Sequence, residues 1–393
     1  MPENRHNVVV FGTGRHGEHY LQRFSKERDY GIDLSSYVDN LAVVDVDEER
    51  LGEVKQEYGV DDFYTSPFEF FRQTEGEDYV AFVVTPATTH KDIGTECMKH
   101  GLPVLIEKPL AYSTEDSEKL KRVQEKTRVP AACAYQMLFS PPFREVSQFA
   151  GQKSIKRFNC EWVKNRGNRN HPIGDIITED IHPFNYMVFL LGDPQSVSTS
   201  GSYMNIRVDP DRRDEAENTP HLEITGEHEF QGKRYLTGRM LGGVDCVFEY
   251  PETGAFIQLS FESGRNQREL RMDMVDESID FEDSNWYDRF FTANLGVSKV
   301  PERSIYPFLR IDGGNTVQGE KNWATEHGTG ELVKDKVWEE ASDELGEEIE
   351  RFLESVESGE RLDPLCSFGD AVATQRVAEG AYQSFVEGKR IEI

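Results

Sequence analysis

The sequence predicts an α/β protein whose first third forms a doubly wound parallel sheet. Short apolar runs recur along residues 7–106, and segments with a helical pattern separate them. Apolar runs without polar alternation indicate strands buried on both faces, as in parallel sheets. A glycine-rich turn follows directly after the first run, at the sheet edge where such folds bind ligands. The length of 393 residues leaves room for a second domain.

Each expected element of the first third rests on its own run of residues. The strands are expected at 7–11, 41–44, 80–84 and 103–106. The helices between them are expected at 15–28, 89–100 and 114–127, and residues 29–40 are expected to form an inserted loop. Ser113, ahead of the third helix, offers a side-chain oxygen of the kind that caps a helix N-terminus.

After about residue 150 the pattern changes to closely spaced strands, which predicts antiparallel pairing in a second, α+β domain. These strands are expected at 154–163, 195–206, 221–230, 234–241, 244–250 and 255–262. Turn signals such as Gly242-Gly243 separate several of them. Helices are expected at 174–191, 340–357 and 367–386, whereas 208–220 is an acidic loop and 283–330 gives no clear assignment.

The charge composition excludes some classes of partner. Lys and Arg number 44 and Asp and Glu 72, so the formal net charge is −28, which repels nucleic-acid phosphates. No apolar run approaches the roughly 20 residues of a membrane-spanning helix, and the first residues lack the apolar segment of a secretory signal. We therefore expect a cytoplasmic protein with neither a nucleic-acid nor a membrane partner. The acid excess is typical of halophile proteins in an acidic proteome, and an ordinary acidic protein is the alternative.

The five cysteines predict neither a disulfide framework nor a zinc site. Their number is odd and no Cys-x-x-Cys pair occurs, so we expect reduced, buried thiols. The histidines show no spacing with carboxylates that suggests metal ligands, and no metal is expected. The cysteines are Cys97, Cys133, Cys160, Cys246 and Cys366.

A glycine-rich motif between the first expected strand and helix predicts a dinucleotide site. The motif is Gly12-Thr13-Gly14-Arg15-His16-Gly17. The first glycine permits a tight turn, the second the approach of a diphosphate to the helix N-terminus, and the third close packing. Asp45, at the end of the second strand, could accept hydrogen bonds from ribose hydroxyls, which favours NAD over NADP. Arg50 could still reach a 2′-phosphate, and a glycine turn beside a solvated acid is the alternative without a cofactor.

Two further motifs follow later strands at the same edge of the expected sheet. Thr85-Pro86 follows the third strand, with His90 shortly after it, and Glu107-Lys108-Pro109 follows the fourth. The ammonium of Lys108 could hydrogen-bond a substrate hydroxyl and stabilise a developing alkoxide. Without further context, Lys108 is more simply a surface lysine.

Together and in this order, the three motifs resemble those of the Gfo/Idh/MocA oxidoreductases. The resemblance implies a Rossmann domain joined to an α+β domain with a large, open, mainly antiparallel sheet. We place the first domain at 1–136, the second at 137–363, and a helix that returns to the first domain at 364–393. The resemblance also implies NAD or NADP as cofactor and a sugar, inositol or related polyol as substrate. Because an open sheet leaves one face to cover, we expect a homodimer or homotetramer.

The resemblance also assigns catalytic residues. The family's catalytic lysine corresponds to Lys108 and its catalytic histidine to His182. Thr178 and Asn185 stand where the family commonly has aspartates. Glu179, which lies one turn before His182 on the expected helix, could replace the first of them as proton-relay partner.

The remaining site residues are expected to contact cofactor or substrate. The cofactor-binding set is Gly12, Thr13, Gly14, Arg15, His16, Gly17, Asp45, Thr85, Pro86, His90, Glu107 and Lys108. The substrate set is Tyr135, Lys164, Arg166, Thr178 and Asn185. Lys164 and Arg166 could replace an arginine that many family members carry, or they could be solvated charges.

The expected reaction is hydride transfer between a nicotinamide and the hydroxyl or carbonyl carbon of the substrate. Neutral His182 would take the hydroxyl proton, so oxidation should rise with pH through the pKa of this histidine. Two alternatives stay open. One is a glycoside-cleaving enzyme that uses bound NAD transiently. The other is a redox-silent regulatory protein, which Thr178 in place of aspartate favours.

Overall fold

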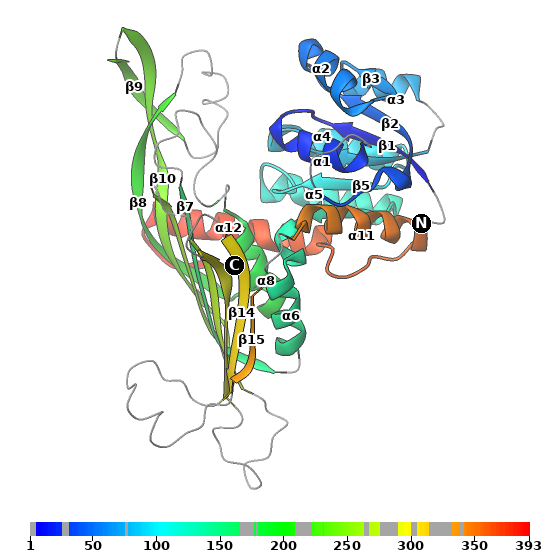
Figure 1. The fold of residues 1–393 in the computed structure, drawn as a ribbon. Coiled ribbons are helices and arrows are strands. Elements are labelled where there is room, and N and C mark those ends of the chain that lie inside the picture. Colours follow the sequence, from blue (N-terminus) through cyan, green and yellow to red (C-terminus); the bar gives the residue numbers. More distant parts are fainter. Residues whose placement is uncertain are drawn as a thin grey trace. The chain divides into compact units, whose positions relative to one another are not determined.

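A computed structural model of the chain (Figure 1) describes residues 5–25, 31–74, 78–151, 153–165, 177, 180–208, 222–230, 232–262, 267–275, 290–299, 305–313, 332–337 and 342–393. The chain divides into two compact units, and each is described by itself. Unit 1 comprises Met1–Phe139 and Ser342–Gln375, and unit 2 comprises Ser140–Ala341 and Arg376–Ile393. No described helix combines the length and the apolar character that crossing a bilayer requires.

Unit 1 contains a six-stranded sheet in which every pair of neighbouring strands is parallel. The spatial order is β3 (Asp62–Tyr64), β2 (Val38–Val44), β1 (His6–Phe11), β4 (Tyr79–Val83), β5 (Val104–Glu107) and β6 (Ala131–Ala134). The direction of winding reverses between β1 and β4, which is where doubly wound sheets bind ligands. The predicted doubly wound α/β fold is confirmed.

Several helices of unit 1 begin where the sequence supplies a side-chain cap. The side chains of Asp47, Ser66 and Ser113 accept hydrogen bonds from backbone N–H groups in the first turns of α2, α3 and α5. The helices are α1 (Arg15–Phe24), α2 (Glu48–Tyr58), α3 (Pro67–Gln73), α4 (Ala87–Lys99), α5 (Thr114–Thr127) and α11 (Glu344–Ser358). The bounds of α5 equal those expected. Helix α1 ends at Phe24, four residues before the expected end at 28.

Strands β1, β4 and β5 are apolar on both faces, and aromatic rings cover them. The ring of Phe82, in β4, lies 5.8 Å from that of Tyr20 and 5.0 Å from that of Phe24, both in α1. On α11, the ring of Phe352 lies 6.0 Å from the same Phe82. This packing explains why residues 342–363 belong to unit 1 and not to the expected second domain.

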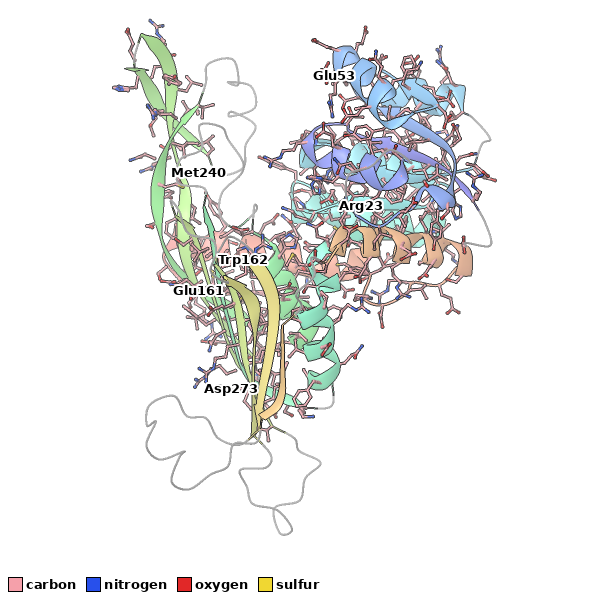
Figure 2. All side chains as sticks on the ribbon, viewed as in Figure 1. Arg23, Glu53, Glu161, Trp162, Met240 and Asp273 are labelled. Atoms are coloured by element: carbon pink, nitrogen blue, oxygen red, sulfur yellow. The ribbon has the colours of Figure 1, made fainter. Side chains whose placement is uncertain are left out.

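A buried ion pair also joins α1 to the start of α11. Figure 2 labels its arginine, Arg23. The guanidinium of Arg23, 1% exposed, donates from Nε to both oxygens of Asp343 at 3.1 Å. Asp343 is also the N-cap of α11, where it accepts from the backbone N–H of Gly346. Hydrogen bonds from Arg23 and from backbone N–H groups lower the pKa of Asp343 against the opposing effect of burial.

Unit 2 contains a ten-stranded sheet. Nine strands follow the order β15 (Leu332–Val337), β14 (Ile305–Gly313), β13 (Phe290–Lys299), β12 (Gln267–Val275), β7 (Ser154–Asn165), β11 (Gly254–Glu262), β10 (Lys233–Glu249), β8 (Ser196–Val208) and β16 (Ile391–Glu392). Strand β9 (Glu223–Phe230) pairs with β10 beside this path. The large, mainly antiparallel sheet is confirmed, and β7 with β11 is the one parallel pair among the described strands of this sheet.

Several strand assignments in unit 2 differ from expectation, and β12 and β15 were not expected at all. Residues 234–241 and 244–250 form one strand, β10, because the Gly242-Gly243 pair makes a register shift against β8 and not a turn. The segment 283–330, which had no assignment, contains β13 and β14.

The helices of unit 2 are α6 (Pro141–Ala150), α8 (His182–Leu191) and the second part of α12 (Phe368–Glu387), which crosses the boundary between the units at 375. The helix expected from 174 is described from His182 onward, with Ile181 as its N-cap.

Candidate functional site

The glycine turn after β1 has the backbone geometry of a phosphate-binding loop. Gly12 has φ of +93°, and a Cβ there would lie 2.8 Å from the carbonyl oxygen of Val84. A Cβ on Gly17 would lie 2.1 Å from the carbonyl oxygen of Gly12, so only glycine allows α1 to start this close to β1. A Cβ on Gly14 would meet nothing within 4 Å. Gly14 therefore borders open space at the N-terminus of α1, where an anion is favoured.

Asp45 is connected directly to this turn. Its Oδ2 accepts hydrogen bonds from the backbone N–H of Thr13 at 2.7 Å and from the Thr13 hydroxyl at 2.8 Å. Its Oδ1 accepts from the backbone N–H of Asp47 at 3.1 Å. Because Thr13 is fully buried, it positions the carboxylate and faces no ligand.

Arg50 is held by neighbouring groups of unit 1. Its Nε donates to the carbonyl oxygen of Thr13 at 3.0 Å, and its Nη1 donates to Glu53 at 2.9 Å. Its Nη2 pairs with Glu18 of α1. Although burial lowers the pKa of Arg50, the hydrogen bonds to Glu53 and Glu18 raise it overall. Two carboxylates are therefore already paired with Arg50.

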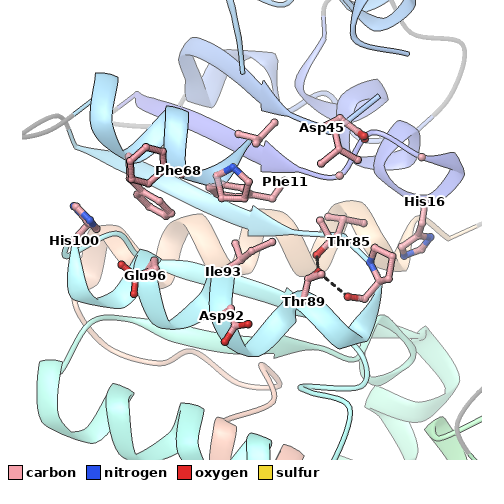
Figure 3. A pocket seen from close by; sticks show the side chains of 18 of the residues that line it. Phe11, His16, Asp45, Phe68, Thr85, Thr89, Asp92, Ile93, Glu96 and His100 are labelled. Carbon is pink, nitrogen blue, oxygen red and sulfur yellow. Dashed lines mark hydrogen bonds between the residues drawn. The ribbon is translucent and has the colours of Figure 1, made fainter. Parts of the chain in front are cut away.

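A cavity of about 1120 Å³ lies in unit 1 beside the turn (Figure 3). One end carries polar groups, and there Figure 3 shows His16, Asp45, Thr85 and Thr89. The other end carries Phe68, which is 76% exposed, and His100. The full lining is Phe11, Gly12, Gly14, Arg15, His16, Val44, Asp45, Val46, Pro67, Phe68, Phe71, Arg72, Val84, Thr85, Pro86, Thr89, Asp92, Ile93, Glu96 and His100. Six of the residues expected to bind cofactor, besides Asp45, line this cavity: Gly12, Gly14, Arg15, His16, Thr85 and Pro86.

Sequence reasoning missed the apolar end of this cavity. Phe68 opens α3, and the ring of Phe71 stacks on that of His100 at 4.8 Å. A large exposed aromatic residue after Pro67 was the available signal, but nothing in the sequence alone places α3 beside α4.

His90 is buried between two loops of unit 1 and not exposed in the cavity. It is 1% exposed, its Nδ1 lies 2.9 Å from the carbonyl oxygen of Pro109, and its Nε2 lies 2.7 Å from that of Thr85. Burial lowers the pKa of His90, although both carbonyl oxygens act to raise it. His90 does not line the cavity. It links the loop after β4 to the loop after β5, instead of making the direct cofactor contact that was expected.

Glu107 is the centre of a buried hydrogen-bond network at the end of β5. Its Oε1 accepts from the Tyr20 hydroxyl at 2.7 Å and lies 2.8 Å from Nε2 of His16. Its Oε2 accepts from the backbone N–H of Lys108 at 3.1 Å. Burial raises the pKa of Glu107, but His16, the Tyr20 hydrogen bond and Lys108 together lower it to about 2. Lys108 itself is half-buried at the carboxyl edge of the sheet.

In unit 2, His182 is the first residue of α8 and is 7% exposed. Its ring stacks on that of Trp162, in β7, with the centroids 6.1 Å apart. The indole N–H of Trp162 has no hydrogen-bond partner in the part of the chain that is described. Asp180 and Asn185, which lie close to His182 in the sequence, are also buried, with exposures of 0% and 2%. Because the helix begins at His182, Asp180 stands in the turn ahead of it.

The remaining expected site residues either lie in the core or fall outside what the structure describes. Tyr135 is fully buried, and its backbone N–H donates to Glu348 at 2.7 Å, so it is a core residue of unit 1. Lys164 lies on β7, where only its backbone is described. Arg166, Thr178 and Glu179 lie outside the described residues.

A protein-family model described as the oxidoreductase family with an NAD-binding Rossmann fold (GFO_IDH_MocA) matches residues 6–135. The chain is 25% identical over 214 residues to scyllo-inositol 2-dehydrogenase (NAD(+)) of Bacillus subtilis, with 52% of this chain and 59% of that protein covered. It is 23% identical to myo-inositol 2-dehydrogenase of Thermotoga maritima, with 50% and 58% covered. The matches therefore span somewhat under two thirds of these curated relatives.

Solved structures extend the similarity in fold to the whole chain. The myo-inositol 2-dehydrogenase of Lactobacillus plantarum has a TM-score of 0.64 at 15% identity, covering 99% of this chain and 100% of that chain. An oxidoreductase of Agrobacterium radiobacter, solved with NAD⁺, L-tartaric acid and magnesium, has a TM-score of 0.65 at 14% identity, covering 99% and 98%. At these identities the likeness concerns the fold.

Proposed function

We propose that this chain, whose residues 6–135 match the model of the Gfo/Idh/MocA oxidoreductase family, is an NAD-dependent dehydrogenase acting on a CH–OH group of an inositol, a sugar or a related polyol. The observation that supports the cofactor best is the glycine turn, with open space at Gly14 and a large cavity beside it. The names of the inositol dehydrogenases to which it is similar support the substrate class.

The residues of the cavity fit a dinucleotide. The N–H groups at the start of α1 would hold the diphosphate, and Asp45 would accept from ribose hydroxyls through its remaining lone pairs. Val46 and Phe68, which also line the cavity, present apolar surface that suits the faces of an adenine ring. When bound, the nicotinamide supplies a hydride acceptor, and every other contribution comes from the protein.

We propose NAD and not NADP as the preferred cofactor. A 2′-phosphate would lie near the Asp45 carboxylate, and Arg50 is already paired with Glu18 and Glu53. Wild-type protein should bind NAD⁺ at least about tenfold more tightly than NADP⁺. Asp45→Ser should narrow the ratio of the two dissociation constants, measured by calorimetry, whereas Asp92→Ser, at the same cavity, should leave it unchanged. Equal affinities in the wild type would reject this preference.

We propose that Lys108 and His182 carry out the proton chemistry. The Lys108 ammonium would hydrogen-bond the oxygen that becomes a carbonyl, and Glu107 fixes its backbone N–H. His182 would accept the hydroxyl proton in its neutral form. Stacking on Trp162 restricts the ring to one orientation, which a base must keep to be efficient.

The test is a screen of inositols and sugars at 340 nm with NAD⁺ and NADP⁺, with and without molar potassium chloride. We expect turnover with a polyol, a loss of kcat of at least about a hundredfold in Lys108→Ala and in His182→Ala, and none in Lys99→Ala, an exposed lysine of α4. Cofactor binding without turnover on any substrate would contradict the proposal. Release of free sugar without net NADH would replace it with transient-redox glycoside cleavage.

We also propose that the chain forms a homo-oligomer through the sheet of unit 2. One face of this sheet is half-exposed and carries Val247, 50% exposed, beside polar residues such as Asp245 and Gln258. A second copy would cover this face. Sedimentation velocity should give a dimer or larger species, and Val247→Arg should weaken it, with Val386→Arg, on an exposed part of α12, as the matched control.

A further inference from the structure

His16 differs from the other residues of the glycine turn because its side chain carries a titratable group. The ring lines the cavity and is 43% exposed, while its Nε2 lies 2.8 Å from Oε1 of Glu107, whose side chain is 10% exposed. Figure 3 shows His16 at the polar end of the cavity, together with Asp45 and Thr85. No step of the proposed reaction uses this contact.

The contact fixes which nitrogen of His16 carries a proton. Glu107, with its pKa of about 2, is a carboxylate near neutrality and can only accept hydrogen bonds. Nε2 must therefore be the N–H donor, and Nδ1 is the atom that gains or loses a proton. Attraction to Glu107 raises the pKa of His16, although burial opposes this shift.

The charged groups around His16 are of both signs. Glu107 faces it from the end of β5, followed by Lys108, whereas α1 contributes Arg23, Tyr20 and His19. Arg15 precedes it on the cavity wall, and Asp45, Asp92 and Glu96 also line the cavity. In a chain with a formal net charge of −28, a dianionic diphosphate needs local cations, and Arg15 and the His16 imidazolium lie within the turn itself, whereas Arg50 beside it is paired with Glu18 and Glu53.

We propose that His16, oriented by Glu107, is a phosphate ligand of the dinucleotide site and that it acts in its protonated form, so that cofactor affinity falls as His16 loses its proton. The inference rests on the proposed function in one respect: the ligand of the cavity is a dinucleotide. It adds a specific side chain and a pH dependence to a site otherwise formed by backbone N–H groups. Protonated Nδ1 donates to a diphosphate oxygen, and neutral Nδ1 has no proton to donate.

The experiment measures the dissociation constants of NAD⁺ and of ADP-ribose by calorimetry from about pH 6 to about pH 9, a range that includes the usual titration of histidine. The diphosphate keeps its charge across this range. For the wild type, we expect affinity for both ligands to fall about tenfold as pH rises. Adenosine, which lacks phosphate, should bind without this dependence.

Two glutamine variants separate the histidines of α1. His16→Gln should bind NAD⁺ with the weaker, high-pH affinity of the wild type at every pH. His19→Gln, whose ring lies 5.8 Å from that of His16, should keep the wild-type profile. NMR titration of the His16 ring in the unliganded protein supplies a readout independent of binding.

A flat profile in the wild type, a profile unchanged in His16→Gln, or an equal dependence for adenosine would each overturn the inference. If NAD⁺ binds to none of the three proteins at any pH, the proposed function fails and not the role of His16 alone. The two failures are therefore distinguishable.

Discussion

The two sheets of this protein bury their residues in different ways. In unit 1, consecutive residues of β1 such as Val9 and Val10 are both fully buried, because helices cover both faces of the parallel sheet. In unit 2, the neighbours Val247 and Phe248 on β10 are 50% and 1% exposed. The second sheet therefore alternates, as expected when helices cover one face. The first sheet can place functional groups at its edges, whereas the second also has a free face.

The same contrast holds for polar groups. In unit 1, the buried His90 ring lies within hydrogen-bond distance of two carbonyl oxygens. On the second sheet polar groups lie in contact with solvent, as in the hydrogen bond from Gln258 to Asp245 at 2.7 Å. The loss of a hydrogen-bond partner should therefore lower the free energy of unfolding more in unit 1 than on the sheet of unit 2.

The largest expected effect comes from lysine substitutions along each sheet. Val9→Lys and Val10→Lys should both lower the free energy of unfolding by more than about 4 kcal/mol, because either charge enters a core. Phe248→Lys should do the same, whereas Val247→Lys should cost less than about 1 kcal/mol. Urea unfolding followed by circular dichroism measures these values. An equal loss in the free energy of unfolding for Val247→Lys and Phe248→Lys would contradict the proposed difference between the two faces of the second sheet.

Alanine substitutions of glycine test how closely the backbone packs. Gly17→Ala should destabilise unit 1 by about 3 kcal/mol, because its Cβ would lie 2.1 Å from a carbonyl oxygen. Gly243→Ala, on β10, has its nearest atom at 3.4 Å and should cost about 1 kcal/mol or less. Gly14→Ala should keep stability but weaken NAD⁺ binding. Loss of stability in Gly14→Ala would show that its role is structural.

Removing a hydrogen-bonding side chain should cost more stability in the core of unit 1 than on the sheet of unit 2. His90→Ala removes the ring that lies between two buried carbonyl oxygens, so that the one that accepts its N–H loses its donor, and should cost about 2 kcal/mol. Gln258→Ala, half-exposed on the second sheet, should cost less than about 0.5 kcal/mol. Thermal unfolding by calorimetry compares the two. A smaller cost at His90 than at Gln258 contradicts the assignment of His90 as a link between loops.

The smallest expected effect concerns two buried carboxyls of unit 1. Burial and the neighbouring Glu107 raise the pKa of Glu348 well above its usual value. Its protonated form therefore favours folding in acid, and that stability is lost as pH rises above the ordinary glutamate pKa. Glu348→Gln should increase the free energy of unfolding at about pH 8 and leave it nearly unchanged at about pH 4. Urea titrations at both values measure this difference.

Glu107 should show the opposite pH dependence. Its pKa is lowered to about 2, so its contribution to stability is present above the ordinary glutamate pKa and is lost as pH falls toward 2. Glu107→Gln should therefore destabilise near neutrality and lose this effect in acid. A gain in stability from Glu348→Gln that is equal at both pH values would contradict the coupling of the two carboxyls.

The strands of unit 1 could be predicted from the sequence more completely than those of unit 2, and the reason is physical. The strands of the first sheet are short and apolar throughout, so each is visible as a local run, and the glycine turn follows directly. Residues 283–330, which contain β13 and β14, include many glycines and asparagines, and they therefore gave no clear strand signal. The Gly242-Gly243 pair wrongly predicted a turn, because the pairing of β10 with β8 continues on both sides of it.

The sequence by itself determined the parallel sheet, the glycine turn, Asp45 after β2 and the order of the three motifs, because these depend on neighbours within one strand and its following turn. Only the tertiary structure decided that α11 belongs to unit 1, that Arg23 pairs with Asp343, and that His16 meets Glu107 across 91 residues of chain. Such contacts join segments far apart in the sequence. Side-chain packing selects them, and no local pattern encodes packing between distant segments.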